Sequence, residues 1–198
     1  MKMKTIIIIG LVAVTSLSSG CATSSNYTLT EADFITKDTT SLLTDLKSND
    51  WWTRNLAAAT LGNRGASAIE PLLATLNDPN RQVRIRAAIS LTEIYASQKD
   101  DPRILNAVLN EARQSDFWIK YNALGCLGQI QHPEVVGVLI EALNDTREEY
   151  GESIQRYAAE VLASRSAEAT EPLIEVLKSS SIGVRYYAVK ALGEIKDP

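Results

Sequence analysis

The sequence predicts an all-α solenoid of about five stacked helix pairs, which occupies residues 41–198. The prediction rests on a leucine that recurs about every 30–36 residues, on an alanine four residues before each of these leucines, and on a second apolar motif between them. Repeats of this length are typical of proteins in which each unit buries its apolar face against the next. The recurring leucines are Leu61, Leu91, Leu127, Leu162 and Leu192.

One helix of each unit contains the recurring leucine. Mostly β-branched residues lie eight positions before it, alanines lie four positions before it, and an isoleucine follows three of the five leucines at the third position. These offsets place the side chains on one face of a helix with 3.6 residues per turn. The alanines let neighbouring helices approach closely, so we expect them in the core. They are Ala57, Ala87, Ala123, Ala158 and Ala188.

The other helix of each unit carries two adjacent aliphatic residues and a third one turn later, and it precedes the leucine helix. Pro71 and Pro172 stand directly before two of these motifs, within the first turn, where a missing N–H costs little. Read in the opposite order, the chain would begin and end on half a unit, and the sequence leaves both orders open. The motifs begin at Leu42, Leu72, Ile104, Leu139 and Leu173.

The unit pattern is clearest in Val184–Ile195, which reads V-R-x-x-A-x-x-x-L-G-x-I. Together with the x-P-L-I-x-x-L motif of the other helix, it resembles the HEAT-like repeat named after the phycobilin (PBS) lyases. The resemblance covers about residues 41–197, and it implies a right-handed superhelix of helix pairs. It says little about activity, because the family includes lyases, scaffolds and uncharacterised proteins.

The first twenty residues have the composition of an export signal. Met1–Lys4 is basic, and Thr5–Val14 is an apolar run too short for a bilayer, which needs about 20 residues. We therefore expect residues 1–20 to be a cleaved signal peptide. An ordinary secretory signal, cleaved after small residues, is the alternative to the lipoprotein signal described next.

The segment Leu17–Cys21 resembles the lipobox of bacterial lipoproteins, although its leucine lies one place further from the cysteine than usual. The resemblance implies that Cys21 is lipidated and anchors the protein to a membrane. Ala22, rather than aspartate, follows the cysteine, which by the sorting rule of Gram-negative lipoproteins implies the outer membrane, facing the periplasm. Residues 21–40 are rich in Ser and Thr and are expected to form a flexible tether, with at most a short helical turn after Thr30.

The charge of the chain argues against nucleic-acid binding. The sequence has 20 Lys and Arg against 24 Asp and Glu, a formal net charge of −4, and no basic stripe. Such a chain lacks the electrostatic attraction on which binding to phosphate backbones depends.

The sequence offers little catalytic chemistry. His132, the single histidine, stands in a turn and is interpreted as a surface polar residue, while Cys126 is interpreted as a small core residue. One histidine cannot build the His-Glu metal sites of some HEAT proteins, and the chain has no Cys/His cluster, P-loop or nucleophile elbow. We therefore expect no metal, no cofactor and no enzymatic activity.

A basic residue lies seven positions before four of the recurring leucines. Aspartates stand four residues before two of these basic residues and in the turns between units. A ligand-binding ladder is one interpretation. The other, which we prefer, is a structural ladder that caps helices and links neighbouring units. Its members are Arg54, Arg84, Lys120, Arg185, Asp50 and Asp116.

Eight aromatic residues fall at equivalent positions near the start of the leucine helices. They either wedge between repeats or form an exposed ridge that would supply anchors for a partner protein. They are Trp51, Trp52, Phe117, Trp118, Tyr121, Tyr157, Tyr186 and Tyr187.

The anchor, tether and repeat surface together predict a non-catalytic scaffold that binds unknown proteins of the cell envelope. Two alternatives remain open at this point. One is a protein that handles a chromophore or small ligand, related to the phycobilin lyases, and the other is a purely structural envelope protein.

Overall fold

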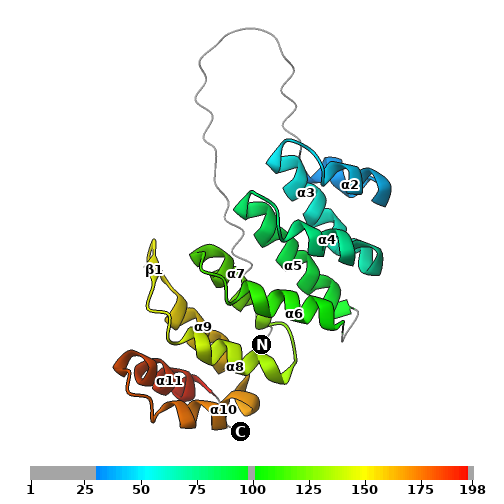
Figure 1. The fold of residues 1–198 in the computed structure, drawn as a ribbon. Helices are drawn as coiled ribbons and strands as arrows, with labels where there is room; N and C mark the ends of the chain where they lie inside the picture. Colours follow the sequence, from blue (N-terminus) through cyan, green and yellow to red (C-terminus); the bar gives the residue numbers. More distant parts are fainter. Residues whose placement is uncertain (1–29, 98–100, 196–198) are drawn as a thin grey trace.

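The computed structural model describes residues 30–97 and 101–195. Within these residues the chain forms five successive helix pairs that stack in sequence order, from α2 and α3 at one end to α10 and α11 at the other (Figure 1). The predicted all-α solenoid is therefore confirmed. The predicted signal peptide and the predicted lipidation site, Cys21, lie outside the described residues.

The first helix of each pair carries the predicted aliphatic motif. These helices are α2 (Thr39–Asp45), α4 (Ile69–Thr75), α6 (Pro102–Glu111), α8 (Pro133–Ala142) and α10 (Ser166–Val176). The second helix of each pair carries the recurring leucine. These helices are α3 (Trp51–Leu61), α5 (Arg81–Ser97), α7 (Phe117–Leu127), α9 (Ile154–Ser164) and α11 (Ile182–Glu194).

Three short elements complete the described chain. A 3-10 segment, η1 (Gly62–Ala68), joins α3 to α4, and a two-stranded antiparallel hairpin of β1 (Glu148–Glu149) and β2 (Glu152–Ser153) precedes α9. Helix α1 (Glu31–Ile35) lies before the first pair.

Helix α1 belongs to the folded domain rather than to a tether. Its Phe34 is fully buried in the core, and the Arg64 guanidinium donates hydrogen bonds to the carbonyls of Ile35 and Lys37 at 3.1 and 2.9 Å. The segment 21–40, which we expected to be flexible, is therefore folded from Thr30 onward. Burial of Phe34 contributes about 2 kcal/mol, and the two hydrogen bonds from Arg64 add to it in holding this short helix on the domain.

The core is continuous along the solenoid. The five alanines that the repeat pattern placed in the core are all at most 1% exposed, as expected for helices in close contact. Leu61, Leu91, Leu127 and Leu162 are fully buried, whereas Leu192 on the last helix is only partly buried. The last helix has no further pair stacked upon it among the described residues.

Side-chain caps fix where the leucine helices begin. The Asp50 carboxylate accepts hydrogen bonds from the backbone N–H groups of Trp52 and Thr53, and Asp116, Ser153 and Ser181 cap α7, α9 and α11 in the same way. None of the described helices is long and apolar enough to cross a membrane.

Candidate functional site

The basic residues seven positions before the leucines bind the turns between repeats. Arg54 makes a two-pronged ion pair with Asp78, with N···O distances of 2.7 and 2.9 Å, and also donates to the Ser48 carbonyl. Arg84 and Arg185 donate to turn carbonyls at 2.7 Å. These guanidinium groups are hydrogen-bonded to residues of the turns between repeats. They therefore stabilise the stacking of the repeats rather than bind a ligand.

The ladder continues at the third and fourth repeats. Lys120 contacts Asp145 at 2.7 Å, and Asp145 also accepts a hydrogen bond from Arg147 at 2.7 Å. The hydrogen bond from Arg147 lowers the pKa of the Asp145 carboxyl most, and the one from Lys120 lowers it further. Together they hold this pKa well below its usual range. Arg81 lies 3.6 Å from Asp116, and Asp50 acts as a helix cap instead of pairing with Arg54.

The eight aromatic residues do not form one ridge. They fall into three separate groups, on α3, on α7 and α9, and on α11, because α5 has Arg81 and Gln82 at the corresponding positions. Trp51 and Trp52 are each about two-fifths exposed, at 42% and 43%. Tyr186 is exposed and contacts Tyr187 edge to face.

The central group is the largest and joins two repeats. Tyr121 of α7 stacks on Tyr157 of α9, with ring centroids 4.3 Å apart and an interplanar angle of 15°. Trp118 meets Tyr121 edge to face at 5.8 Å, and Phe117 lies beneath them at 6.0 Å from Tyr121. Phe117, the first residue of α7, is only 3% exposed, so of the two alternatives for the aromatic residues it follows the one in which the ring is packed in the core rather than on an exposed ridge.

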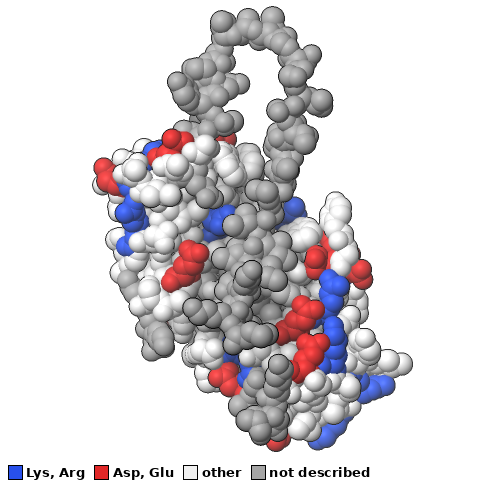
Figure 2. Space-filling model, turned by 180° about the vertical axis from the view of Figure 1, so that it is seen from behind, with Lys and Arg blue, Asp and Glu red and all other residues white. Residues whose placement is uncertain are grey.

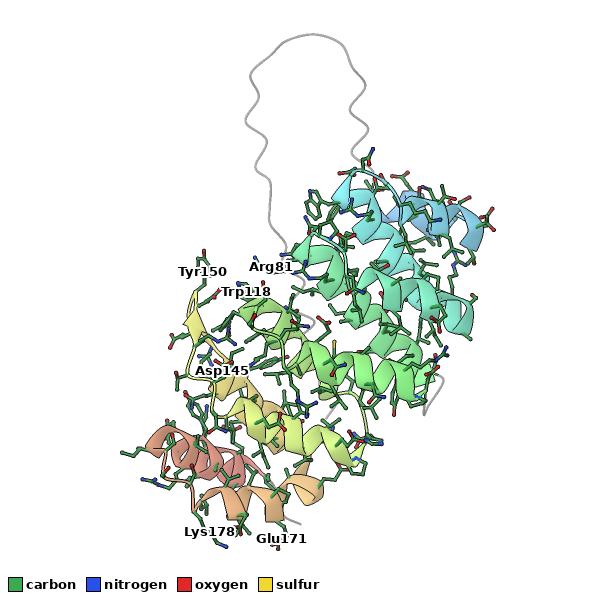
Figure 3. The ribbon with its side chains drawn as sticks, viewed as in Figure 1. Arg81, Trp118, Asp145, Tyr150, Glu171 and Lys178 are labelled. Atoms are coloured by element: carbon green, nitrogen blue, oxygen red, sulfur yellow. The ribbon has the colours of Figure 1, made fainter. Side chains whose placement is uncertain are left out.

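A residue that the sequence analysis missed completes this group. Tyr150 stands at the tip of the β1–β2 hairpin, is almost fully exposed, and lies 6.3 Å from Trp118, ring centroid to ring centroid. Figure 3 shows the two side chains together at one edge of the solenoid. Tyr150 and Gly151 both have positive φ, which gives the hairpin its tight two-residue turn. We call Phe117, Trp118, Tyr121, Tyr150 and Tyr157 the aromatic cluster.

Charged groups border the aromatic cluster. The Tyr121 hydroxyl donates a 2.8 Å hydrogen bond to Glu152, and Arg156 contacts the same carboxylate oxygen at 2.9 Å. Burial, followed by the Glu152 carboxylate, raises the pKa of Tyr121 above its usual value, so its hydroxyl remains protonated and continues to donate. The cluster thus combines a partly exposed aromatic surface with an arginine and a glutamate at its rim.

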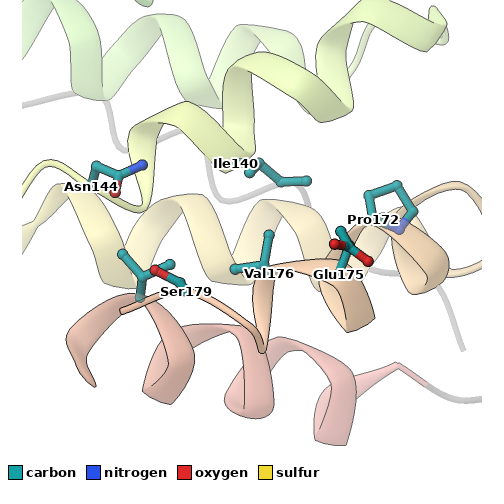
Figure 4. A pocket seen from close by; sticks show the side chains of 7 residues that line it. Ile140, Asn144, Pro172, Glu175, Val176 and Ser179 are labelled. Atoms are coloured by element: carbon teal, nitrogen blue, oxygen red, sulfur yellow. The ribbon is translucent and has the colours of Figure 1, made fainter. Parts of the chain in front are cut away.

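A second surface lies on the first helices of the last repeats. An apolar groove of about 420 Å³ runs between α8 and α10, lined by Ile140, Pro172, Val176 and Val184, with Asn144 and Glu175 at its edges (Figure 4). Figure 2, which views the molecule from behind, shows acidic and basic side chains side by side on the visible part of the face opposite to the one seen in Figure 1.

The remaining candidates are structural. Cys126 is buried, and burial raises the pKa of its thiol to about 11, which keeps it unreactive. His132 caps the start of α8 by accepting a hydrogen bond from the Glu134 N–H. Across residues 30–97 and 101–195, no group of three His, Cys, Asp or Glu side chains could hold a metal ion.

The chain matches two repeat-family models. The model described as HEAT repeats matches residues 39–112, and the model described as PBS lyase HEAT-like repeat matches residues 119–145 and 184–198. The chain is a HEAT-repeat protein. The resemblance noted in its repeat pattern is therefore confirmed.

A curated relative points to a lyase. The chain is 34% identical over 96 residues to phycocyanobilin lyase subunit alpha of Synechococcus elongatus, a match that covers 46% of this chain. The match spans only 35% of that relative, about a third of its length. The HEAT-repeat chain is thus lyase-related, and the prediction of a protein without enzymatic function is contradicted, because this relative is a lyase subunit.

A solved structure agrees in fold. The structure of the complex of CpcE and CpcF of phycocyanin lyase from a Nostoc species matches with a TM-score of 0.55 and 18% identity, over 91% of this chain and 70% of the Nostoc chain. The prediction of no enzymatic function rested on the lack of local catalytic motifs. The relation to a lyase lies instead in the repeat sequence itself.

Proposed function

We propose that this protein is a lyase-type HEAT-repeat subunit that binds a linear tetrapyrrole of the phycocyanobilin class on the aromatic cluster. The observation that carries the proposal is the 34% identity to a phycocyanobilin lyase subunit. The aromatic cluster supports it, because it is a partly exposed aromatic surface spanning two repeats, with the almost fully exposed Tyr150 ring beside Trp118.

The chemistry of the cluster suits such a ligand. A linear tetrapyrrole has a flat conjugated system that stacks on aromatic rings, acidic propionate groups that pair with arginine, and pyrrole N–H groups that donate to carboxylates. Trp118 and Tyr150 supply the aromatic surface, and Arg156 and Glu152 supply the two charges within the same patch. Arg156 is partly exposed, with 40% of its side chain accessible, so its guanidinium can also contact a ligand.

The groove between α8 and α10 is less suitable. Its described lining combines aliphatic residues and a proline with Asn144, Ser179 and Glu175 and holds no aromatic ring or basic residue, so it provides neither ring stacking nor a cation for propionates. Ligand binding there would be insensitive to changes in the aromatic cluster, and this gives the experiment below a clear second outcome.

A fluorescence and absorbance titration with phycocyanobilin tests the proposal. The full chain should bind with saturation, quench tryptophan fluorescence and shift the visible absorption band of the ligand. Trp118→Ala should weaken binding at least about tenfold, the effect of losing one stacking contact of about 1.4 kcal/mol. Trp52→Ala is the matched control, since Trp52 occupies the equivalent position of α3 outside the cluster. Equal binding by both variants would move the site elsewhere, and absence of binding would refute the proposed function.

A further inference from the structure

A polar cavity lies between two successive turns of the solenoid. Its volume is about 480 Å³, and it opens between the turn joining α4 to α5 and the turn joining α6 to α7. The lining residues that matter here are Asp78, Arg84, Glu111, Gln114, Ser115 and Asp116. Arg81, labelled in Figure 3, pairs with Asp116 at this edge of the molecule.

Glu111 is the unusual member of this lining. Glu111 is only 7% exposed, yet its side-chain carboxylate makes no hydrogen bond and no ion pair with any residue in the described part of the chain. It is also the last residue of α6, where the helix dipole disfavours a negative charge. A buried carboxylate in this setting is costly unless a cation accompanies it.

The other repeats show what this position normally holds. The last residues of α8 and α10 are Ala142 and Val176, so the fold does not require an acid there. The last residue of α2 is Asp45, and its carboxylate is paired with the Lys37 ammonium at 2.6 Å. Where another repeat has an acid at this position, the acid therefore has a cationic partner, and Glu111 lacks one.

The neighbouring charges do not supply that partner. Asp78 is neutralised by Arg54, and Asp116 caps α7 and faces Arg81. Arg84 is the one cation among the lining residues, and it donates to the carbonyls of Asp78 and Pro79 rather than to Glu111. Burial raises the pKa of Glu111, and the positive charge of Arg84 opposes this shift only in part. Among the described lining residues, Glu111 is thus the carboxylate that no guanidinium or ammonium group contacts directly.

We propose that this cavity binds a primary ammonium or guanidinium group, with the Glu111 carboxylate as its acceptor. The cation would take the place that Lys37 holds beside Asp45. Either a lysine or arginine side chain of a partner protein or a free organic amine could provide it. The site does not depend on tetrapyrrole binding, because its residues are distinct from the aromatic cluster.

Titration of the ¹⁵N-labelled full chain, followed by NMR at constant ionic strength, tests this proposal. The probes are N-acetyl-arginine amide, propylammonium and tetramethylammonium, which has no N–H to donate. The first two should cause saturable shifts of the Gln114 and Ser115 amide signals, and tetramethylammonium should not. Stronger binding of the arginine amide would favour a protein side chain as the source, and stronger binding of propylammonium a free amine.

Two variants make the test decisive. Glu111→Gln keeps the shape and removes the charge, and it should weaken binding of the N–H donors at least tenfold. Glu141→Gln removes a charge from the exposed surface, where Glu141 pairs with Arg113, and should leave binding unchanged. Far-UV circular dichroism checks that both variants are folded. Unchanged affinity in Glu111→Gln, or equal shifts with tetramethylammonium, would overturn the proposal.

Discussion

The Arg165 guanidinium donates a 2.9 Å hydrogen bond to the carbonyl of Ile130, across 35 residues of sequence. The same group contacts the Leu127 carbonyl and pairs with Glu168 at 2.8 Å, although the Arg165 side chain is only 1% exposed. A buried cation thus closes the C-terminal end of α7, whose last carbonyls have no partner within the helix. This contact ties the third repeat to the fourth.

Replacing Arg165 with alanine should therefore be strongly destabilising. The change removes the charged donor from the Ile130 carbonyl and leaves the Leu127 carbonyl with the backbone N–H of Ile130 alone, and we expect a loss of about 2–4 kcal/mol in the free energy of unfolding. Urea denaturation measures it. Arg113→Ala is the control, since Arg113 is about half exposed and should change stability by less than about 0.5 kcal/mol. Equal effects of the two changes would show that the buried contact adds nothing.

Gly125 sets the geometry of the aromatic cluster. A Cβ atom at this position would lie 2.5 Å from the Tyr157 hydroxyl oxygen, so Gly125→Ala must displace Tyr157 from its stack on Tyr121. We expect a loss of about 1–3 kcal/mol in stability and weaker tetrapyrrole binding.

Gly137 provides the matched control for that change. It lies within α8, and nothing stands within 4 Å of the position of its Cβ atom. Gly137→Ala should therefore stabilise the protein by about 0.5–1 kcal/mol through helix propensity, without affecting binding. Thermal unfolding separates the two variants. A stabilised Gly125→Ala would show that the contact with Tyr157 does not constrain the stack.

Asp145 makes stability depend on acidic pH. Its pKa is lower in the folded chain than the value of about 3.9 expected when unfolded, because Arg147 and Lys120 bind its carboxylate. Its stabilisation is thus present above about pH 4 and is lost as the pH falls through the lower folded pKa. Asp145→Asn should be less stable at pH 7 by about 1–2 kcal/mol, and its stability should fall less steeply below pH 4. Parallel acid-induced unfolding curves would contradict this account.

The predicted anchor on Cys21 is tested by cell fractionation. Lipidated protein should be found with the membranes. The Cys21→Ala protein has no acylation site and therefore no acyl chains to hold it there, so it should no longer be anchored to the membrane by lipid. Metabolic labelling with palmitate gives a second measurement. A protein that is soluble in both forms would favour the ordinary secretory signal.

The repeat pattern predicted the fold because burial is periodic in a solenoid. The alanines and leucines at the repeated positions lie in one continuous core, so Ala57 or Ala123 could be placed from spacing alone. The same pattern located Trp118, Tyr121 and Tyr157 on equivalent turns, which the structure brings together.

The other features of the site depend on contacts that do not recur from repeat to repeat, so the sequence pattern could not predict them. Tyr150 joins the cluster because the turn at Tyr150 and Gly151 folds the segment between α8 and α9 back on itself as the β1–β2 hairpin. Arg165 and Glu111 are charged residues at helix ends, where sequence alone favours solvent exposure, and only the packing of neighbouring repeats buries them. Phe117 precedes Trp118 directly on the same helix and its ring meets the Trp118 ring edge to face, yet Phe117 is buried whereas Trp118 is only partly buried, a difference that the spacing alone does not give.

Circular dichroism in the visible band of phycocyanobilin tests the central claim most directly. A flexible tetrapyrrole held in one twist by the aromatic cluster should gain a strong induced signal in the presence of the native chain. That signal should persist with Trp52→Ala and be lost with Trp118→Ala at the same ligand concentration. An induced signal that survives Trp118→Ala, or no signal with the native chain, would contradict tetrapyrrole binding at this site.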